Sequence, residues 1–208
     1  MKYKNFIFDF DGTIADTFTE SIIAINKVAQ DFGLEKITDD KIPEIRRMTG
    51  SELISASGIS KYKLPYLLYK TKKILNQSLD SIKVCNNMES TLKKMHANGC
   101  NLGIITSNSK KNVRQFLALN NIDFFDFVIS ERNIFGKGKI ILKTMSKLKM
   151  KSEETVYVGD ELRDIEAARN AKIDAISVTW GFQAREVLEK YNGNNIIDES
   201  ESLLNFAK

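Results

Sequence analysis

The sequence predicts an α/β fold in which a parallel sheet forms the core and a small helical module is inserted near the amino end. Five short apolar runs, rich in β-branched and aromatic residues, have the composition of buried central strands. Helical patterns alternate with these runs, which is typical of a parallel sheet with helices on both faces. An interval of about ninety residues after the first run has helical spacing and little strand character, which indicates the insertion.

The first predicted strand is Tyr3–Phe10, and the inserted helices follow it. Two long apolar stripes recur there at helical spacing: Gly33 is a plausible stop for the first, and Pro65 lies near the start of the second. Shorter helices are predicted around Glu44–Met48 and Glu52–Ala56. We therefore expect residues 17–80 to form a helical cap, and residues 1–16 and 81–208 to form the α/β core. The two stripes consist of Phe18, Ile22, Ile25, Ala29 and Phe32, and of Leu64, Leu68, Thr71, Leu75 and Leu79.

Each of the other four predicted strands precedes a helix, so the two kinds of element alternate to the end of the chain. In chain order these strands are Leu102–Thr106, Phe125–Ile129, Thr155–Val158 and Ala175–Thr179. The apolar residues that follow them at helical spacing are Val113, Phe116 and Leu117; Ile141, Met145 and Leu148; Ile165, Ala168 and Ala171; and Val187, Leu188 and Tyr191.

The composition is that of a globular protein with a sizeable core. The chain has 208 residues, of which 42% are hydrophobic, and its mean hydropathy is −0.27. No apolar run approaches the roughly 18–20 residues of a membrane helix, and the apolar stretch at the amino end is too short for a secretory signal. We therefore expect a cytoplasmic protein that has no membrane partner.

Charge and cysteine usage argue against two further classes of function. The 31 basic residues are scattered among 27 acidic ones, and the net charge of +4 includes no basic cluster with interleaved aromatic residues, so nucleic-acid binding is not expected. Cys85 and Cys100 lack the spacing of a zinc site or a disulfide scaffold, and we interpret them as ordinary buried thiols. A mildly cationic surface suits an anionic substrate.

Carboxylates and hydroxyls stand where several predicted strands end. The motifs are Asp9-Phe10-Asp11-Gly12-Thr13, Thr106-Ser107-Asn108, and Gly159-Asp160 with Asp164 four residues on, and Lys137 and Lys139 occupy a loop after the third strand. Singly, such motifs also form turns or helix caps. Because carboxyl ends of strands in an open α/β sheet share one rim, we expect all of them to converge on a ligand site.

The acids at this rim predict a magnesium site. Asp9 and Asp160 cannot lie close together as bare anions without a cation, and hard oxygen ligands with room for a phosphate suit Mg²⁺. If the chain turns after Asp11, its backbone carbonyl can reach the metal while its side chain faces the substrate. A hydroxyl from Ser107 and an ammonium from Lys137 would hold the phosphoryl oxygens and offset charge in the transition state.

Four segments of the chain together resemble the motifs of one family. They are Asp9–Thr17, Gly103–Asn108, Val158–Ala168 and Val178–Phe182. The first, second and third of these are similar to the first, second and fourth motifs of the haloacid dehalogenase-like hydrolase superfamily, and the last resembles the end of the fifth strand in its phosphoglycolate-phosphatase-like branch. The resemblance covers essentially the whole chain and implies a Rossmann-like core with an inserted helical cap.

The resemblance implies a Mg²⁺-dependent phosphatase that acts on a small phosphorylated metabolite. Asp9 would attack phosphorus to form an aspartyl-phosphate, and Asp11 would protonate the leaving alcohol and then activate water. Asp9, the Asp11 carbonyl and Asp160 would bind Mg²⁺, with Asp164 in support. The remaining site residues implied are Ser107 and Lys137 at the phosphoryl group, and Gly12, Thr13, Thr106, Asn108 and Arg46 at the substrate.

Two assignments stay open in the sequence. Thr106 is the alternative to Ser107 for the hydroxyl of the second motif. Lys139 is the alternative to Lys137, because the lysine–proline pair of many relatives is replaced here by Lys-Gly-Lys. We favour Lys137 because its spacing to Asp160 is closer to the spacing in the family it resembles.

Function also has alternatives at this stage. A phosphomutase of the β-phosphoglucomutase type would return the phosphoryl group to a sugar, and a non-catalytic binding module would keep the fold without turnover. In the cap, Arg46 or Arg47 would grip an anionic substrate, or both would be solvated helix residues. The physiological substrate and the oligomeric state are left open.

Overall fold

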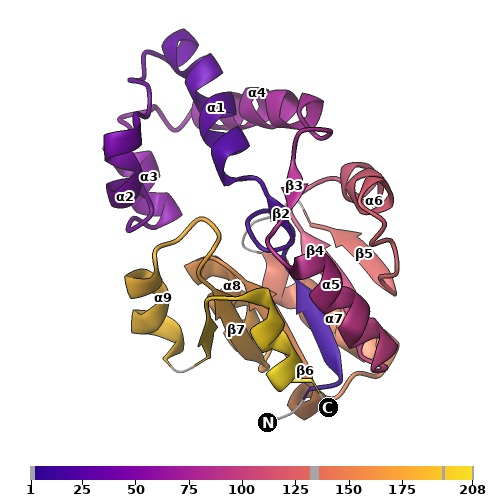
Figure 1. Ribbon diagram of the computed structural model, residues 1–208. Coiled ribbons are helices and arrows are strands. Elements are labelled where there is room, and N and C mark those ends of the chain that lie inside the picture. The colour runs from indigo at the N-terminus through magenta and orange to yellow at the C-terminus, as the bar shows by residue number, and fades with distance from the viewer. Residues whose placement is uncertain (1–2, 132–135, 194, 208) are drawn as a thin grey trace.

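A six-stranded parallel sheet lies at the centre of the protein (Figure 1). The computed structural model describes residues 3–131, 136–193 and 195–207. The strands lie in the order β5-β4-β1-β6-β7-β8, and helices cover both faces, so the predicted α/β fold is confirmed. Their bounds are β1 Asn5–Phe8, β4 Asn101–Thr106, β5 Phe127–Ser130, β6 Thr155–Gly159, β7 Asp174–Val178 and β8 Ile196–Ile197.

The five predicted strands are all present, with small differences at their ends. The third begins at Phe127 instead of Phe125, because the Phe125 ring already packs edge-on against Phe8 at 6.3 Å and the Asp126 carboxylate accepts from the Leu102 backbone N–H at 2.9 Å. The edge strand β8 was not predicted. With two residues it carries no periodicity that a sequence could reveal.

Alternate residues of the central strands feed two separate cores. In β1, Phe6 and Phe8 point to one face and Ile7 to the other, as the two-residue period of a strand requires. The first face is covered by α5 and α6, and the second by α7, α8 and α9. These helices span Met88–Ala97, Lys110–Leu119, Lys137–Leu148, Leu162–Asn170 and Arg185–Asn192.

The order of the strands places a topological switch point at the carboxyl ends of β1 and β6. The chain passes from β1 to β4 and β5 on one side, and then returns to β6 on the other side of β1. The helix that leads to β4 packs on one face of the sheet, and the helix that follows β6 packs on the opposite face. Ligands of open α/β sheets bind outside the carboxyl ends of the strands at such a switch point.

Between β1 and α5 the chain forms four α-helices that lie beyond the carboxyl ends of the sheet (Figure 1). Two short antiparallel strands connect them to the sheet, β2 (Ala15–Asp16) and β3 (Lys83–Val84), neither of which was predicted. We call residues 17–80 the helical segment. Its helices are α1 Phe18–Ala29, α2 Ile42–Ile45, α3 Gly50–Ala56 and α4 Leu64–Gln77. Within the described residues, no helix has both the length and the apolar character needed to span a bilayer.

Candidate active site

The loop that follows β1 brings Asp9 to the rim and then folds tightly. The Asp9 backbone N–H donates to the Val158 carbonyl of β6 at 2.8 Å, and its side chain is 2% exposed. The Phe10 carbonyl then accepts from the N–H groups of Ile14 and Ala15, both at 3.0 Å. Gly12 lies inside this turn with φ at +77°, where glycine is favoured. A Cβ at this position would also overlap the Asp160 carboxylate, so the turn can lie against that aspartate only with glycine.

Asp160 follows β6 and is fully buried. Its Oδ1 accepts from the Thr13 hydroxyl at 2.8 Å, and its Oδ2 accepts from the Phe182 backbone N–H at 2.7 Å. Burial raises the pKa of Asp160 well above its ordinary value, and the charges of Glu161, Asp164 and Asp9 raise it further. The carboxylate is thus held in a fixed orientation in surroundings that disfavour its negative charge.

A buried lysine stands between two of the aspartates. The Lys137 Nζ, at the start of α7, lies 3.1 Å from Asp9 Oδ2 and 2.7 Å from Asp164 Oδ1. The ammonium also lies over the Tyr157 ring, 5.3 Å from its centroid. Burial lowers the pKa of Lys137, but the charges of Asp164 and Asp9 outweigh this and hold the pKa well above its ordinary value. Lys139, the alternative in the sequence, is exposed.

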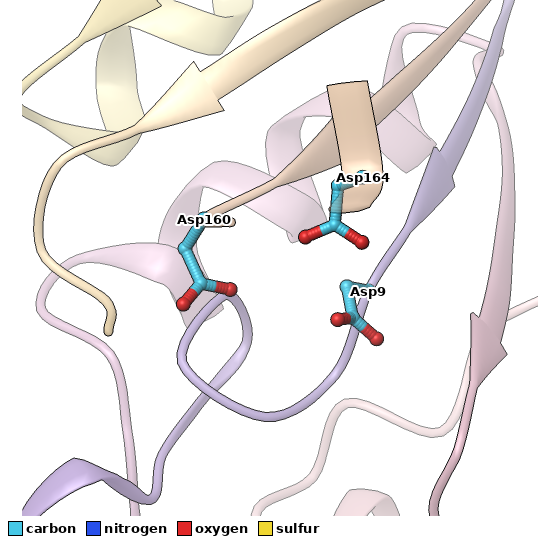
Figure 2. A group of neighbouring side chains, drawn as sticks. All are labelled: Asp9, Asp160 and Asp164. Carbon is cyan, nitrogen blue, oxygen red and sulfur yellow. The ribbon is translucent and has the colours of Figure 1, made fainter. Parts of the chain in front are cut away.

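The carboxylates of Asp9, Asp160 and Asp164 surround one small space (Figure 2). One oxygen from each lies within 4.8 Å of the others, and all three residues are buried. Asp164 is fixed by its position in the first turn of α8, where its carboxylate accepts from the Glu161 backbone N–H at 3.1 Å. Three buried carboxylates so close together repel one another, and Lys137 supplies a single positive charge. A hard divalent cation with oxygen ligands fits this donor set.

The Asp11 carboxylate lies against the side chain of Asn108, which follows β4. Asn108 Nδ2 lies 3.4 and 3.3 Å from the two Asp11 oxygens. Burial, together with the charge of Asp9, raises the pKa of Asp11 to about 6, although Lys72 and Arg163 act in the opposite direction. A carboxyl group with this pKa can hold or release a proton near neutral pH.

A cleft of about 870 Å³ opens between α4 and the rim of the sheet. On the sheet side it is lined by Asp11, Ser107 and Asn108, and on the α4 side by apolar and basic residues. Lys72 of α4 reaches across and donates to the Ser107 carbonyl. The cleft therefore leads from solvent to Asp11. The residues that line it from α4 include Leu68, Tyr69, Lys72, Lys73 and Leu75.

The structure brings most of the predicted site residues together, but three point elsewhere. Thr13 is fully buried and its hydroxyl supports Asp160, while the buried Thr106 hydroxyl accepts from the Asn108 backbone N–H at 3.0 Å. Neither side chain faces the cleft. Arg46 also turns away from it: the guanidinium donates to the carbonyls of Thr179 and Gly181 at 3.2 and 2.6 Å.

Two further residues belong to this neighbourhood and were not assigned from the sequence. Arg163 precedes Asp164 in α8, forms an ion pair with Glu161 and lines the cleft beside Asp11. Lys72 lies on the face of α4 that meets the rim. The position of Arg163 inside the motif after β6 was a signal that it lies near the site. Nothing local indicated Lys72, because its place depends on how the helical segment packs.

The chain is similar to proteins of known families over most of its length. The family model described as haloacid dehalogenase-like hydrolase matches residues 6–178. A phosphoglycolate phosphatase of Synechococcus elongatus is 30% identical over 88% of this chain and 86% of its own, and a pyrophosphatase PpaX of Bacillus mycoides is 26% identical over 98% and 96%. A solved structure from Bacteroides fragilis, described as a haloacid dehalogenase-like hydrolase, is 26% identical, covers 97% of this chain and 100% of its own, and superposes with a TM-score of 0.82.

Proposed function

Since this chain belongs to the haloacid dehalogenase-like hydrolases and is a hydrolase of phosphate esters, we propose that it is a Mg²⁺-dependent phosphatase for a small phosphate monoester. One observation carries the proposal. Asp9, Asp160 and Asp164 form a buried cluster bridged by Lys137, and Asp11 stands next to it at the mouth of a cleft. This arrangement offers a cation site, a carboxylate nucleophile and a proton donor within one rim.

The proposed reaction has two displacements at phosphorus. In the first, an Asp9 oxygen forms a bond to phosphorus as the bond to the leaving oxygen breaks, and Asp11 gives its proton to that oxygen. In the second, Asp11 takes a proton from water, whose oxygen attacks phosphorus and releases Asp9 and inorganic phosphate. The raised pKa of Asp11, about 6, supports a group that changes protonation between these steps. Lys137 and Ser107 bind the phosphoryl oxygens.

The proposed metal ligands are the side chains of Asp9, Asp160 and Asp164 with the backbone carbonyl of Asp11. The buried, closely spaced carboxylates support this choice, because oxygen ligands of this kind suit Mg²⁺. When bound, the ion offsets negative charge on the phosphoryl group. Thr13 and the Phe182 N–H hold Asp160 in place for that role.

The proposed substrate carries a second negative charge close to its phosphate. Lys72 and Arg163 line the same cleft as Asp11, where the leaving group would lie, and their positive charges favour anions there. The phosphoglycolate phosphatase and pyrophosphatase named among the relatives each act, by name, on a compound of this kind. We propose the monoester 2-phosphoglycolate as the first candidate. The second is inorganic pyrophosphate, a phosphoanhydride whose cleavage would use the same two displacements, and residues 17–80 are proposed as the cap that selects between them.

The test is release of inorganic phosphate from these two compounds and a panel of sugar phosphates, with Mg²⁺ and with a chelator. We expect Mg²⁺-dependent turnover concentrated on one or two compounds. Asp9→Asn should lower it by roughly a thousandfold or more, since the nucleophile is lost, while Asp80→Asn, at an exposed position, should not change it.

Other outcomes point to the two alternatives. An isomeric sugar phosphate as product, with little free phosphate, would indicate a phosphomutase. No turnover of any compound by a folded protein that binds Mg²⁺ would favour a binding module. Full activity of Asp9→Asn would contradict the proposed nucleophile whichever compound is turned over.

A further inference from the structure

Arg46 connects the helical segment to the loop that holds Asp160. It lies just after α2, and its guanidinium donates to the Thr179 and Gly181 carbonyls of the β7–α9 loop, which we define as residues 179–184. The guanidinium also lies over the Phe18 ring, 5.3 Å from its centroid. A planar group with several donors suits two carbonyls and an aromatic face at once, which a lysine would not match.

The same loop fixes the orientation of Asp160. The Phe182 N–H donates to Asp160 Oδ2 at 2.7 Å, and Phe182 is the residue directly after Gly181. The Gly181 backbone is in close contact with this aspartate: a Cβ at Gly181 would overlap the carboxylate. The Gly181–Phe182 peptide therefore shares with the Thr13 hydroxyl the control of the direction in which the Asp160 carboxylate points.

Two more hydrogen bonds join the helical segment to this loop. The Ala184 N–H donates to the Arg46 carbonyl at 2.7 Å, and Gln183 Nε2 donates to the Met48 carbonyl at 3.3 Å. The Oε1 atom of Gln183 accepts a hydrogen bond from the Leu162 N–H, at the start of α8. The buried Gln183 thus touches both the helical segment and the helix that carries Asp164.

We infer that Arg46 is a positioning residue for the cation site: it anchors the β7–α9 loop so that Asp160 is held ready to bind a divalent ion. This inference rests on the cation site proposed above and extends it to a residue that does not touch the ion. It differs from the role expected from the sequence, in which Arg46 contacts the substrate. Arg46 does not line the described cleft, and its donors point to backbone carbonyls.

The test measures Mg²⁺ binding without turnover. The melting temperature of the full-length protein is followed as Mg²⁺ is added in the absence of substrate. Because the stabilisation grows as RT ln(1 + [Mg²⁺]/Kd), a fit gives the apparent Kd, which we call the Mg²⁺ midpoint. Arg46→Met should move this midpoint to a Mg²⁺ concentration about three- to tenfold higher. A change of this size approaches the loss of metal affinity that follows when groups that orient metal ligands are removed. Arg47→Met is the matched control. The neighbouring Arg47 is exposed, and among the described residues its guanidinium pairs with Glu186 alone, at 3.9 Å, so the midpoint of Arg47→Met should stay unchanged.

Arg46→Lys provides a second variant if Arg46→Met does not fold. A lysine keeps the charge, but its ammonium cannot lie as a planar group over the Phe18 ring while it donates to the carbonyls, so its midpoint should fall between those of the wild type and Arg46→Met. Activity then supplies a second readout. At saturating Mg²⁺ the KM for substrate should be unchanged. The Mg²⁺ concentration for half-maximal activity should rise in parallel with the Mg²⁺ midpoint.

The possible failures can be told apart. An Arg46 variant with a lower melting temperature but an unchanged Mg²⁺ midpoint would show a purely structural role and overturn the inference alone. A higher KM at saturating Mg²⁺ with an unchanged midpoint would overturn it in favour of a substrate contact. A wild-type protein whose melting temperature ignores Mg²⁺ would overturn both the inference and the proposed cation site.

Discussion

Lys137 and Lys139 are two residues apart in the first turn of α7 and have opposite surroundings. The Lys137 Nζ is enclosed between Asp9 and Asp164, whereas Lys139 is exposed. Helical spacing explains the difference, because positions i and i+2 point to different sides of α7. The pair is therefore a natural comparison for the role of one charge.

Replacing Lys137 with Met should remove activity and destabilise the protein. Breaking a buried ion pair by removing one partner costs about 3–5 kcal/mol, because the remaining carboxylates stay buried without a counter-charge. Lys139→Met should change the free energy of unfolding by no more than about 0.5 kcal/mol. Urea unfolding with a chelator present, together with phosphate release, measures both. Equal effects of the two substitutions would contradict the assignment.

The carboxyl groups of the site predict an unusual dependence of stability on pH. Burial raises the pKa of Asp160 and Asp164, and it raises that of Asp11 to about 6, each above the value in the unfolded chain. The folded protein therefore binds more protons than the unfolded chain between those two values. Stability is greatest below the unfolded pKa and falls as the pH rises through the folded pKa. The raised pKa of Lys137 acts only at alkaline pH and leaves this range unaffected.

We therefore expect the metal-free protein to be more stable at a pH of about 5.5 than at about 7.5. Each proton difference contributes at most about 1.4 kcal/mol per pH unit to the free energy of unfolding. Asp160→Asn should flatten this slope, and Mg²⁺ should add more stability at the higher pH. Urea unfolding in chelator at several pH values is the measurement. Stability that rises with pH in the metal-free protein would contradict the prediction.

Side-chain direction was the part of the site that the sequence could not supply. Strand ends predict that Asp9, Asp160 and Asp164 meet, because the ends of parallel strands share a rim. They do not predict that the Thr13 hydroxyl turns inward to Asp160, or that Arg46 donates to carbonyls more than a hundred residues away in sequence. Those directions depend on tertiary packing.

Among the elements, β4 and β5 are joined by a close fit between a glycine and a ring. Gly103 pairs with Phe127 in the parallel register, and the ring occupies the space where a Cβ of Gly103 would stand. Gly103→Ala should therefore destabilise the protein by about 1–3 kcal/mol through overpacking. In a Phe127→Leu background the same change should cost less by at least about 0.5 kcal/mol.

A control glycine tests whether the effect comes from space and not from the backbone. Gly50 begins α3, and a Cβ there would meet nothing within 4 Å. Gly50→Ala should not destabilise the protein, since alanine favours helix. Chemical denaturation of the four variants and the wild type gives the comparison. A Gly103→Ala cost that is the same in both backgrounds would rule out the ring as its cause.

Long helices and strands were predictable from the sequence, and two-residue strands were not. Five strands and the long helices α1 and α4 carry enough residues for a periodic pattern, and each was predicted. The two-residue strands β2, β3 and β8 do not. Pairing of Ala15 with Val84 also joins positions far apart in sequence, so no local signal announces it. The short helix α2 ends before the predicted Glu44–Met48 stretch does, at Ile45.

At the scale of the whole molecule, both cysteines report on the integrity of the fold. Cys85 follows β3, its backbone N–H donates to the Ile14 carbonyl at 2.9 Å, and the side chain is buried; Cys100 is buried just before β4. Burial raises the pKa of each thiol above its ordinary value. Neither thiolate forms readily, and each cysteine is more than nine-tenths buried.

We therefore expect the native protein to resist alkylation by iodoacetamide at a pH of about 8, while the urea-unfolded protein reacts at both positions. Intact mass after a timed exposure counts the modified thiols. Because Cys85 adjoins the connection to the helical segment, selective labelling of Cys85 in the native protein would contradict this picture and reveal an opening at β2 and β3. Mg²⁺ should not alter the result.

The chain leaves the sheet for the helical segment at Asp16 and returns at Lys83, and these two residues pair with each other. The more than sixty residues between them therefore form one insertion whose two ends lie side by side, about one interstrand spacing apart. Such an insertion joins the rest of the backbone at one place. Recombination between related genes can exchange the helical segment at these two short strands, provided that the new segment keeps contacts like those of Arg46 and Met48 with the β7–α9 loop, so that selectivity can evolve while the cation site stays in place.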